Sequence, residues 1–162
     1  MYRSESKILT EGPEIDRRIA YWRFKGQRVV LTNGCFDILH VGHADYLERA
    51  RALGDVLVVA VNSDESIRRL KGPGRPIVPE AARYRLLAAL EAVDAVLPFA
   101  ADDPLELIRR VRPAILVKGA DYTPEQVVGA AELPQWGGRL ELLALVPGFS
   151  TTDLVARIRQ TD

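Results

Sequence analysis

The sequence predicts an α/β fold: a single doubly wound, Rossmann-like domain with a five-stranded parallel sheet. Short apolar runs alternate with helical patterns along the chain, which is typical of strands joined by crossover helices. Residues 56–61 are apolar at every position, as expected of a strand that is covered on both faces. The chain has 162 residues, 48% of them hydrophobic, which suffices for one domain with its own core.

The expected elements follow this alternation in order. Apolar, β-branched runs predict strands over residues 28–32, 56–61, 95–98, 114–118 and 140–145. Apolar residues at helical spacing predict helices over residues 14–23, 41–53, 81–92, 104–110 and 154–158. Residues 1–26 are expected to form an N-terminal arm and a short helix, with the first ten residues loose, and residues 27–162 the domain itself. Residues 66–79, rich in Arg, Lys, Gly and Pro, are expected to form a basic, mobile loop.

Composition and charge argue against several classes of protein. Lys plus Arg number 22 and Asp plus Glu number 22, so the formal net charge of zero does not favour nucleic acid as a partner. Cys35 is the one cysteine and cannot form an internal disulfide. The N-terminus is polar, unlike a signal peptide, and no apolar run approaches the roughly 20 residues that span a bilayer. We therefore expect a cytoplasmic protein without a membrane partner.

The segment after the first expected strand, residues 33–43, carries the strongest chemical signal. Parallel sheets of this kind bind ligands beyond the carboxyl ends of their strands, and Gly34 allows the backbone to approach such a ligand closely. His40 and His43, the two histidines of the chain, flank Gly42 at an expected helix start. The N–H groups and dipole of a helix N-terminus attract anions, and imidazoles can donate hydrogen bonds to phosphoryl oxygens. The segment therefore predicts a phosphate site.

Two other interpretations of the histidines stay open at this point. Both can be surface or capping residues. They can also ligate zinc together with Cys35 and Asp37, but their spacing matches no common structural zinc finger. No metal site built from protein side chains is therefore predicted.

Residues 34–43, Gly-Cys-Phe-Asp-Ile-Leu-His-Val-Gly-His, resemble the HxGH signature of the nucleotidyltransferase superfamily in its cytidylyltransferase form. Residues 62–64, 68–72, 75–76, 90–94, 117–122 and 149–152 resemble the heptose 1-phosphate adenylyltransferase branch, and the resemblance extends over about residues 27–160. It implies transfer of AMP from ATP to D-glycero-β-D-manno-heptose 1-phosphate, with release of pyrophosphate. It also implies Mg²⁺ bound mainly through the ATP phosphates. Dimers are common in the family, so a homodimer is one expected assembly.

The resemblance assigns roles to the residues at the matching positions. It implies catalytic roles for His40, His43 and Lys71. It implies nucleotide binding by Asn33, Gly34, Phe36, Asp37, His40, Gly42, His43, Asn62, Asp64, Arg83, Lys118, Gly119, Asp121, Ser150, Thr151 and Thr152.

Several of these residues have a second interpretation. Lys71 can be a solvated charge, and Arg83 can form a surface ion pair. Asp121 can form a turn, and Asp37 can orient its loop instead of contacting the nucleotide. The hydroxyl residues 150–152 can cap the last helix, with or without a phosphate bound to it.

Two other functions also stay open. Glycerol-3-phosphate cytidylyltransferases would use the same chemistry, but they carry an arginine shortly before the Ser-Thr-Thr element, where residues 145–149 have no basic side chain. A non-catalytic nucleotide-binding module would bind ATP without releasing pyrophosphate. A panel of triphosphates and sugar phosphates separates these alternatives.

Overall fold

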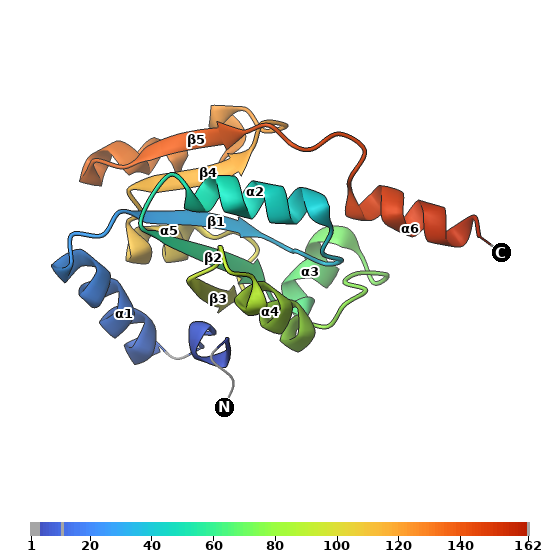
Figure 1. The fold of residues 1–162 in the computed structure, drawn as a ribbon, viewed down its shortest axis with the longest axis horizontal. Coiled ribbons are helices and arrows are strands. Elements are labelled where there is room, and N and C mark those ends of the chain that lie inside the picture. The colour runs from blue at the N-terminus through green and yellow to red at the C-terminus, as the bar shows by residue number, and fades with distance from the viewer. Residues whose placement is uncertain (1–3, 11, 162) are drawn as a thin grey trace.

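The fold is a five-stranded, all-parallel sheet between two layers of helices, in a computed structural model that describes residues 4–10 and 12–161 (Figure 1). The strand order is β3-β2-β1-β4-β5. The strands are β1 (Val29–Gly34), β2 (Val56–Asn62), β3 (Ala95–Phe99), β4 (Ile115–Gly119) and β5 (Arg139–Leu143). The predicted fold class is confirmed, and every expected strand is present with its ends shifted by a few residues.

The sheet buries both of its faces, because successive side chains of a strand point to opposite sides. In β2, Val56, Val58 and Ala60 belong to one apolar cluster. Leu57 and Val59, which alternate with them, belong to the cluster on the other face. This pattern explains why the strand is apolar at every position.

Each face is covered by its own helices. The first cluster includes residues of α1 (Gly12–Phe24), α5 (Leu105–Val111) and the 3₁₀ helix η3 (Ala130–Trp136). The second cluster includes residues of α2 (Val41–Arg51) and α4 (Glu80–Ala89). Two helices, α3 (Asp64–Lys71) and α6 (Thr151–Arg159), lie toward the carboxyl ends of the strands (Figure 1). Two short 3₁₀ helices, η1 (Glu5–Lys7) and η2 (Pro124–Gln126), complete the description.

The expectation of a mobile loop over residues 66–79 is wrong for residues 66–71, which belong to α3. The Ser63 side chain caps this helix by accepting a hydrogen bond from the Ser66 backbone N at 3.2 Å. Acidic residues occupy its first turn and basic residues its last turn, as the helix dipole favours, and Ile67 is fully buried. Only residues 72–79 connect α3 to α4 without helical structure.

The expectation of loose N-terminal residues is wrong for residues 5–9. Leu9 is buried in the core, and its backbone N donates to the Val96 carbonyl at 3.0 Å. Lys7 Nζ donates to the Leu90 and Val93 carbonyls at 3.1 and 2.6 Å. Leu9 and the bridge between Ile8 and Val96 join the segment to β3, and Lys7 joins it to the turn before β3. The apolar residues of the segment therefore have a partner that the sequence pattern did not indicate. Residues 1–3 lie outside the described residues, and the boundary expected at residue 26 stays a prediction.

Candidate active site

A pocket of about 750 Å³ opens at the carboxyl ends of the strands. Its walls come from the loop after β1, the start of α2, the end of α3, the loop after β4 and the start of α6. Most of the predicted site residues line it, namely Asn33, Gly34, Phe36, Asp37, His40, Gly42, His43, Asn62, Lys71, Lys118, Gly119, Asp121, Ser150, Thr151 and Thr152. The structure thus brings together residues that lie far apart in the sequence, from Asn33 to Thr152.

The loop after β1 takes its shape from Phe36. This residue has a φ of 47°, in the left-handed region that non-glycine residues rarely occupy, and such conformations concentrate at functional sites. Its ring is buried, with its centroid 5.4 Å from that of the His43 ring. A Cβ on Gly34 would lie 3.1 Å from the same ring, so a larger residue there would crowd the Phe36 side chain. The loop therefore places the Phe36 ring against the His43 ring.

The two histidines stack at the start of α2. Their ring centroids are 3.9 Å apart with an interplanar angle of 25°, and the His40 backbone N donates to His43 Nδ1 at 3.4 Å. His40 Nδ1 is buried and has no hydrogen-bond partner among the described residues. A Cβ on Gly42 would lie 2.9 Å from this atom, so glycine at position 42 makes room for the ring. The pair matches the predicted arrangement at a helix start.

Burial keeps both imidazoles neutral. Burial, with a smaller contribution from the neighbouring His40, lowers the pKa of His43 to about 4. Burial also lowers the pKa of His40 below its usual value. Because Nδ1 of His43 accepts a hydrogen bond, a neutral His43 ring carries its proton on Nε2 and can donate it to an anion in the pocket.

The start of α6 borders the histidines. Ser150 caps the helix by accepting a hydrogen bond from the Asp153 backbone N at 3.0 Å. The Thr151 hydroxyl lies 3.5 Å from the Ile38 carbonyl, which joins α6 to the loop after β1. The capping interpretation is confirmed for Ser150, and the helix N-terminus lines the same pocket as His40 and His43.

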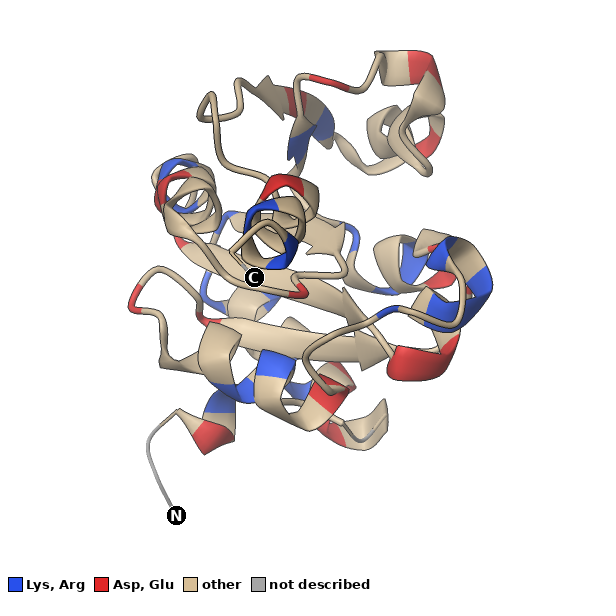
Figure 2. Cartoon of the chain, turned by 90° about the vertical axis from the view of Figure 1, so that its right-hand side faces the viewer, with Lys and Arg blue, Asp and Glu red and all other residues tan. Residues whose placement is uncertain are grey.

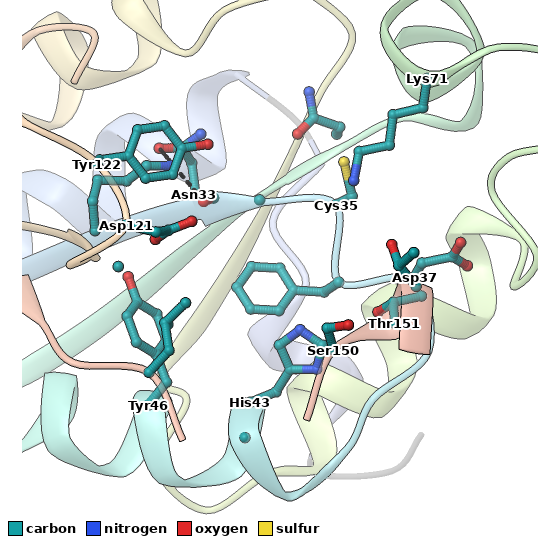
Figure 3. A pocket seen from close by; sticks show the side chains of 18 of the residues that line it. Asn33, Cys35, Asp37, His43, Tyr46, Lys71, Asp121, Tyr122, Ser150 and Thr151 are labelled. Atoms are coloured by element: carbon teal, nitrogen blue, oxygen red, sulfur yellow. Dashed lines mark hydrogen bonds between the residues drawn. The ribbon is translucent and has the colours of Figure 1, made fainter. Parts of the chain in front are cut away.

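One end of the pocket, here termed the β4 end, consists of Lys118, Asp121, Tyr122, Val127 and Leu145. Lys118 Nζ donates to the backbone and side-chain oxygens of Asn33 at 3.2 and 3.3 Å and lies 4.8 Å from the Tyr122 ring centroid. Burial lowers the pKa of Lys118, although Asp121 opposes this effect. Figure 3 shows Tyr122 beside Asn33 and Asp121 pointing toward Tyr46. This end offers an aromatic ring and apolar side chains next to one carboxylate.

The opposite end, here termed the α3 end, consists of Asn62, Lys71, Arg75 and Asp102. Lys71 is exposed, and its side chain points from α3 toward Cys35, far from Tyr122 (Figure 3). Arg75 forms an ion pair of 3.0 Å with Asp37, whose side chain is 6% exposed. This end offers two cations with amide and carboxylate groups, and it has no aromatic ring.

Two predicted site residues lie outside the pocket lining. Arg83 is fully buried, and its guanidinium donates to the Val78 carbonyl at 3.0 Å, the Cys35 carbonyl at 2.6 Å and Asp64 at 2.8 Å. The expectation that Arg83 and Asp64 contact the nucleotide disagrees with this geometry, because each group is occupied by the other. Arg83 instead ties the loop after β1 to the start of α3 and to the end of the α3–α4 connection.

Several lining residues were missed, among them Tyr46, Arg75, Asp102, Tyr122 and Phe149. Tyr46 follows His43 by three positions on α2, so helical spacing alone could have placed it on the same face. Its hydroxyl lies 2.8 Å from that of Thr32, and both residues are buried. Arg75, Tyr122 and Phe149 lie in segments that carry the family resemblance, although no site role was assigned to them, and Asp102 has no sequence signal that separates it from an ordinary loop residue.

Figure 2, which shows the right-hand side of the molecule in Figure 1, has Lys and Arg interspersed with Asp and Glu along the elements. Within the described chain, no three His, Cys, Asp or Glu side chains are grouped as metal ligands. Of the pocket carboxylates, Asp37 is already bonded to Arg75 and to two backbone N–H groups. No helix within the described ranges has the length and apolarity of a membrane span.

The sheet order, the glycine-flanked histidine pair and the helix N-termini around one pocket define a nucleotide-binding α/β domain of the HxGH class. The chain belongs to the cytidylyltransferase-like family, which matches residues 31–157. The predicted family is therefore confirmed.

Relatives named bifunctional protein HldE cover most of the chain. Those of Methylobacillus flagellatus and Syntrophotalea carbinolica are 52% and 57% identical to it over 87% and 90% of its length. The matched regions are 29% and 28% of these relatives, so the chain spans less than a third of each. A solved lipopolysaccharide core biosynthesis protein from Thermoplasma volcanium is 30% identical, with a TM-score of 0.62 over 75% of this chain and 98% of that one.

Proposed function

We propose that the protein transfers AMP from ATP to D-glycero-β-D-manno-heptose 1-phosphate, giving ADP-heptose and pyrophosphate. The observation that carries this proposal is the stacked His40–His43 pair at the start of α2, in one pocket with the start of α6. The identity of 52–57% to proteins named HldE supports the heptose branch. A nucleotide-activated heptose also suits a protein related to one described as acting in lipopolysaccharide core biosynthesis.

The two ends of the pocket suit the two substrates. Tyr122 and the apolar side chains of the β4 end suit a flat base, and Asp121 can accept hydrogen bonds from ribose hydroxyls. The cations of the α3 end suit a sugar phosphate, whose hydroxyls can bond to Asn62 and Asp102. The α-phosphate of ATP then lies between the two ends, beside the histidines.

The reaction needs positioning and charge stabilisation more than a protein nucleophile. An oxygen of the acceptor phosphate attacks the α-phosphorus of ATP, and the bond from that phosphorus to the bridging oxygen breaks. Nε2 of His43 and the His40 ring donate hydrogen bonds to the α-phosphate as charge develops, together with Lys71. Pyrophosphate leaves toward the start of α6. Mg²⁺ enters with ATP as part of the substrate, and we expect the reaction in the cytoplasm.

A substrate panel tests the proposal. The chain is incubated with ATP or CTP and with heptose 1-phosphate, other sugar 1-phosphates or glycerol 3-phosphate, and pyrophosphate release is measured while mass spectrometry identifies the nucleotide sugar. ATP with the heptose phosphate should give the highest kcat/KM. A preference for CTP with glycerol 3-phosphate would assign the cytidylyltransferase function. ATP binding without pyrophosphate release in any combination would make the chain a binding module.

A further inference from the structure

Arg75 is a pocket cation with most of its donors free. It lies in the connection between α3 and α4, and its side chain is 21% exposed and lines the pocket. A guanidinium has five N–H groups in a planar fork. In the described part of the chain, the Arg75 side chain has one hydrogen-bond partner, Asp37 Oδ2, which its Nη1 contacts at 3.0 Å. The remaining N–H groups can therefore serve a ligand.

Asp37 holds this guanidinium in place. Its carboxylate also accepts the backbone N–H groups of Ile77, at 2.9 and 3.0 Å, and of Val78, at 2.8 Å. Burial by itself raises the pKa of Asp37, but these bonds and the Arg75 charge hold it below its usual value, so the carboxylate is ionised at neutral pH. Because Asp37 lies in the loop that carries His40, the same carboxylate fixes Arg75 relative to the histidine pair.

The other arginines near this end are already occupied. The Arg83 guanidinium donates hydrogen bonds to three oxygens inside the protein, and Arg69 pairs with Glu65 and Asp102. Arg75 is thus the guanidinium of the pocket lining that can meet a phosphate through two parallel hydrogen bonds, which a lysine such as Lys71 cannot do. Its position at the α3 end, away from Tyr122 and the base-binding features, favours the phosphate of the acceptor over that of ATP.

We propose that Arg75 binds the phosphate of the sugar 1-phosphate, and that Asp37 is a positioning residue that holds Arg75 for this purpose. This inference rests on the proposed function in assigning an acceptor phosphate to the α3 end. The ion pair keeps the guanidinium inside the pocket before the substrate arrives. Arg75 therefore determines affinity for the acceptor, while the histidines act on the α-phosphate.

Steady-state kinetics of Arg75→Gln, Arg75→Lys and Asp37→Asn test the inference. A charged hydrogen bond contributes about 1.5–3 kcal/mol, so R75Q should raise the acceptor KM about 10- to 100-fold. The ATP KM and kcat should stay within about threefold, because those steps use other groups. R75K should recover part of the affinity through its charge alone, and D37N should shift the acceptor KM in the same direction by less. Arg17→Gln is the matched control, since Arg17 is exposed on α1.

A binding measurement separates this inference from the proposed reaction. Calorimetry follows inorganic phosphate binding to the full chain in the presence of α,β-methylene-ATP, which occupies the triphosphate site without reacting. Phosphate affinity should fall about tenfold or more in R75Q and remain unchanged in R17Q. Equal affinity in R75Q and the parent chain would overturn the inference, and so would a rise in the ATP KM without a rise in the acceptor KM. If only the reaction with heptose 1-phosphate fails, the proposed acceptor is wrong, and the phosphate titration still tests the role of Arg75.

Discussion

The β4 end and the α3 end of the pocket hold their cations in different ways. Lys118 at the β4 end extends from a strand, and its amine is fixed by two oxygens of Asn33 and by the Tyr122 ring. At the α3 end, Lys71 is exposed at a helix end and Arg75 lies on a connection without helical structure, held through Asp37. At the first end the cation is fixed to the sheet through Lys118 and Asn33, and the second end depends on one buried carboxylate and on Arg83.

This difference indicates which substrate each end can discriminate. Groups fixed to strands hold their geometry closely, which suits a ligand with one rigid base. A connection between helices can change in length and composition without disturbing the sheet, which suits the selection of different acceptors. We therefore expect mutations at the β4 end to affect ATP and mutations at the α3 end to affect the acceptor. The histidines lie between the ends, and we expect mutations of them to affect kcat.

The largest expected effect is at the histidines. Replacing His40 or His43 by alanine should lower kcat by about two to four orders of magnitude, because each removes a donor that acts on the transition state. Both KM values should change little. Stopped-flow pyrophosphate release measures this, with circular dichroism to verify folding. Near-normal turnover in both folded variants would contradict the roles given to the pair, and a selective rise in one KM would assign that histidine to one end.

Arg83→Ala should destabilise the fold by about 3 kcal/mol or more, because it leaves a buried network without its donor. Denaturant unfolding measures the effect, with Arg17→Ala as the exposed control. As the urea concentration increases, the acceptor KM of this variant should rise at a lower concentration than its ATP KM, because Arg83 supports the α3 end. Unchanged stability with a strong loss of ATP binding would restore the nucleotide-contact role predicted from the sequence.

The stability of the free protein should depend on pH through His43. Its pKa is about 4 in the folded state and near 6.5 when unfolded, so the unfolded chain binds more protons between these values. The contribution of His43 to the free energy of unfolding is therefore fully present above about pH 6.5. It decreases by at most about 3 kcal/mol as the pH falls toward 4. Urea titrations at several pH values should show this slope, and His43→Ala should flatten it. A slope that is unchanged in the variant would place the titrating group elsewhere.

The smallest effect is expected at Tyr122. Its replacement by alanine should raise the ATP KM about tenfold, since stacking of a base on an aromatic ring contributes about 1–3 kcal/mol. The acceptor KM and kcat should remain within about threefold. Tyr122→Phe should behave like the parent chain, because it retains the ring. If the acceptor KM rises instead, the assignment of substrates to the two ends must be reversed.

The amino-acid sequence by itself determined the fold class and the centre of the site. Alternating apolar runs specify strands and helices locally, and residues 34–43 carry the HxGH signature within one short segment. It also placed Asn33, Lys118, Asp121 and residues 150–152 correctly at the pocket, because the ends of parallel strands meet at one edge. Their chemical roles remain predictions.

Only the tertiary structure decided which charged groups face the pocket. Arg83 and Arg75 have the same chemistry in the sequence, yet one is buried among carbonyl oxygens and the other lines the cavity. Leu9 likewise lies in a segment that the sequence predicts to be loose, but in the structure it bonds to β3. These outcomes depend on contacts between residues distant in the chain, such as Asp37 with Val78 or Arg83 with Cys35, and no local pattern encodes which partner a long polar side chain meets.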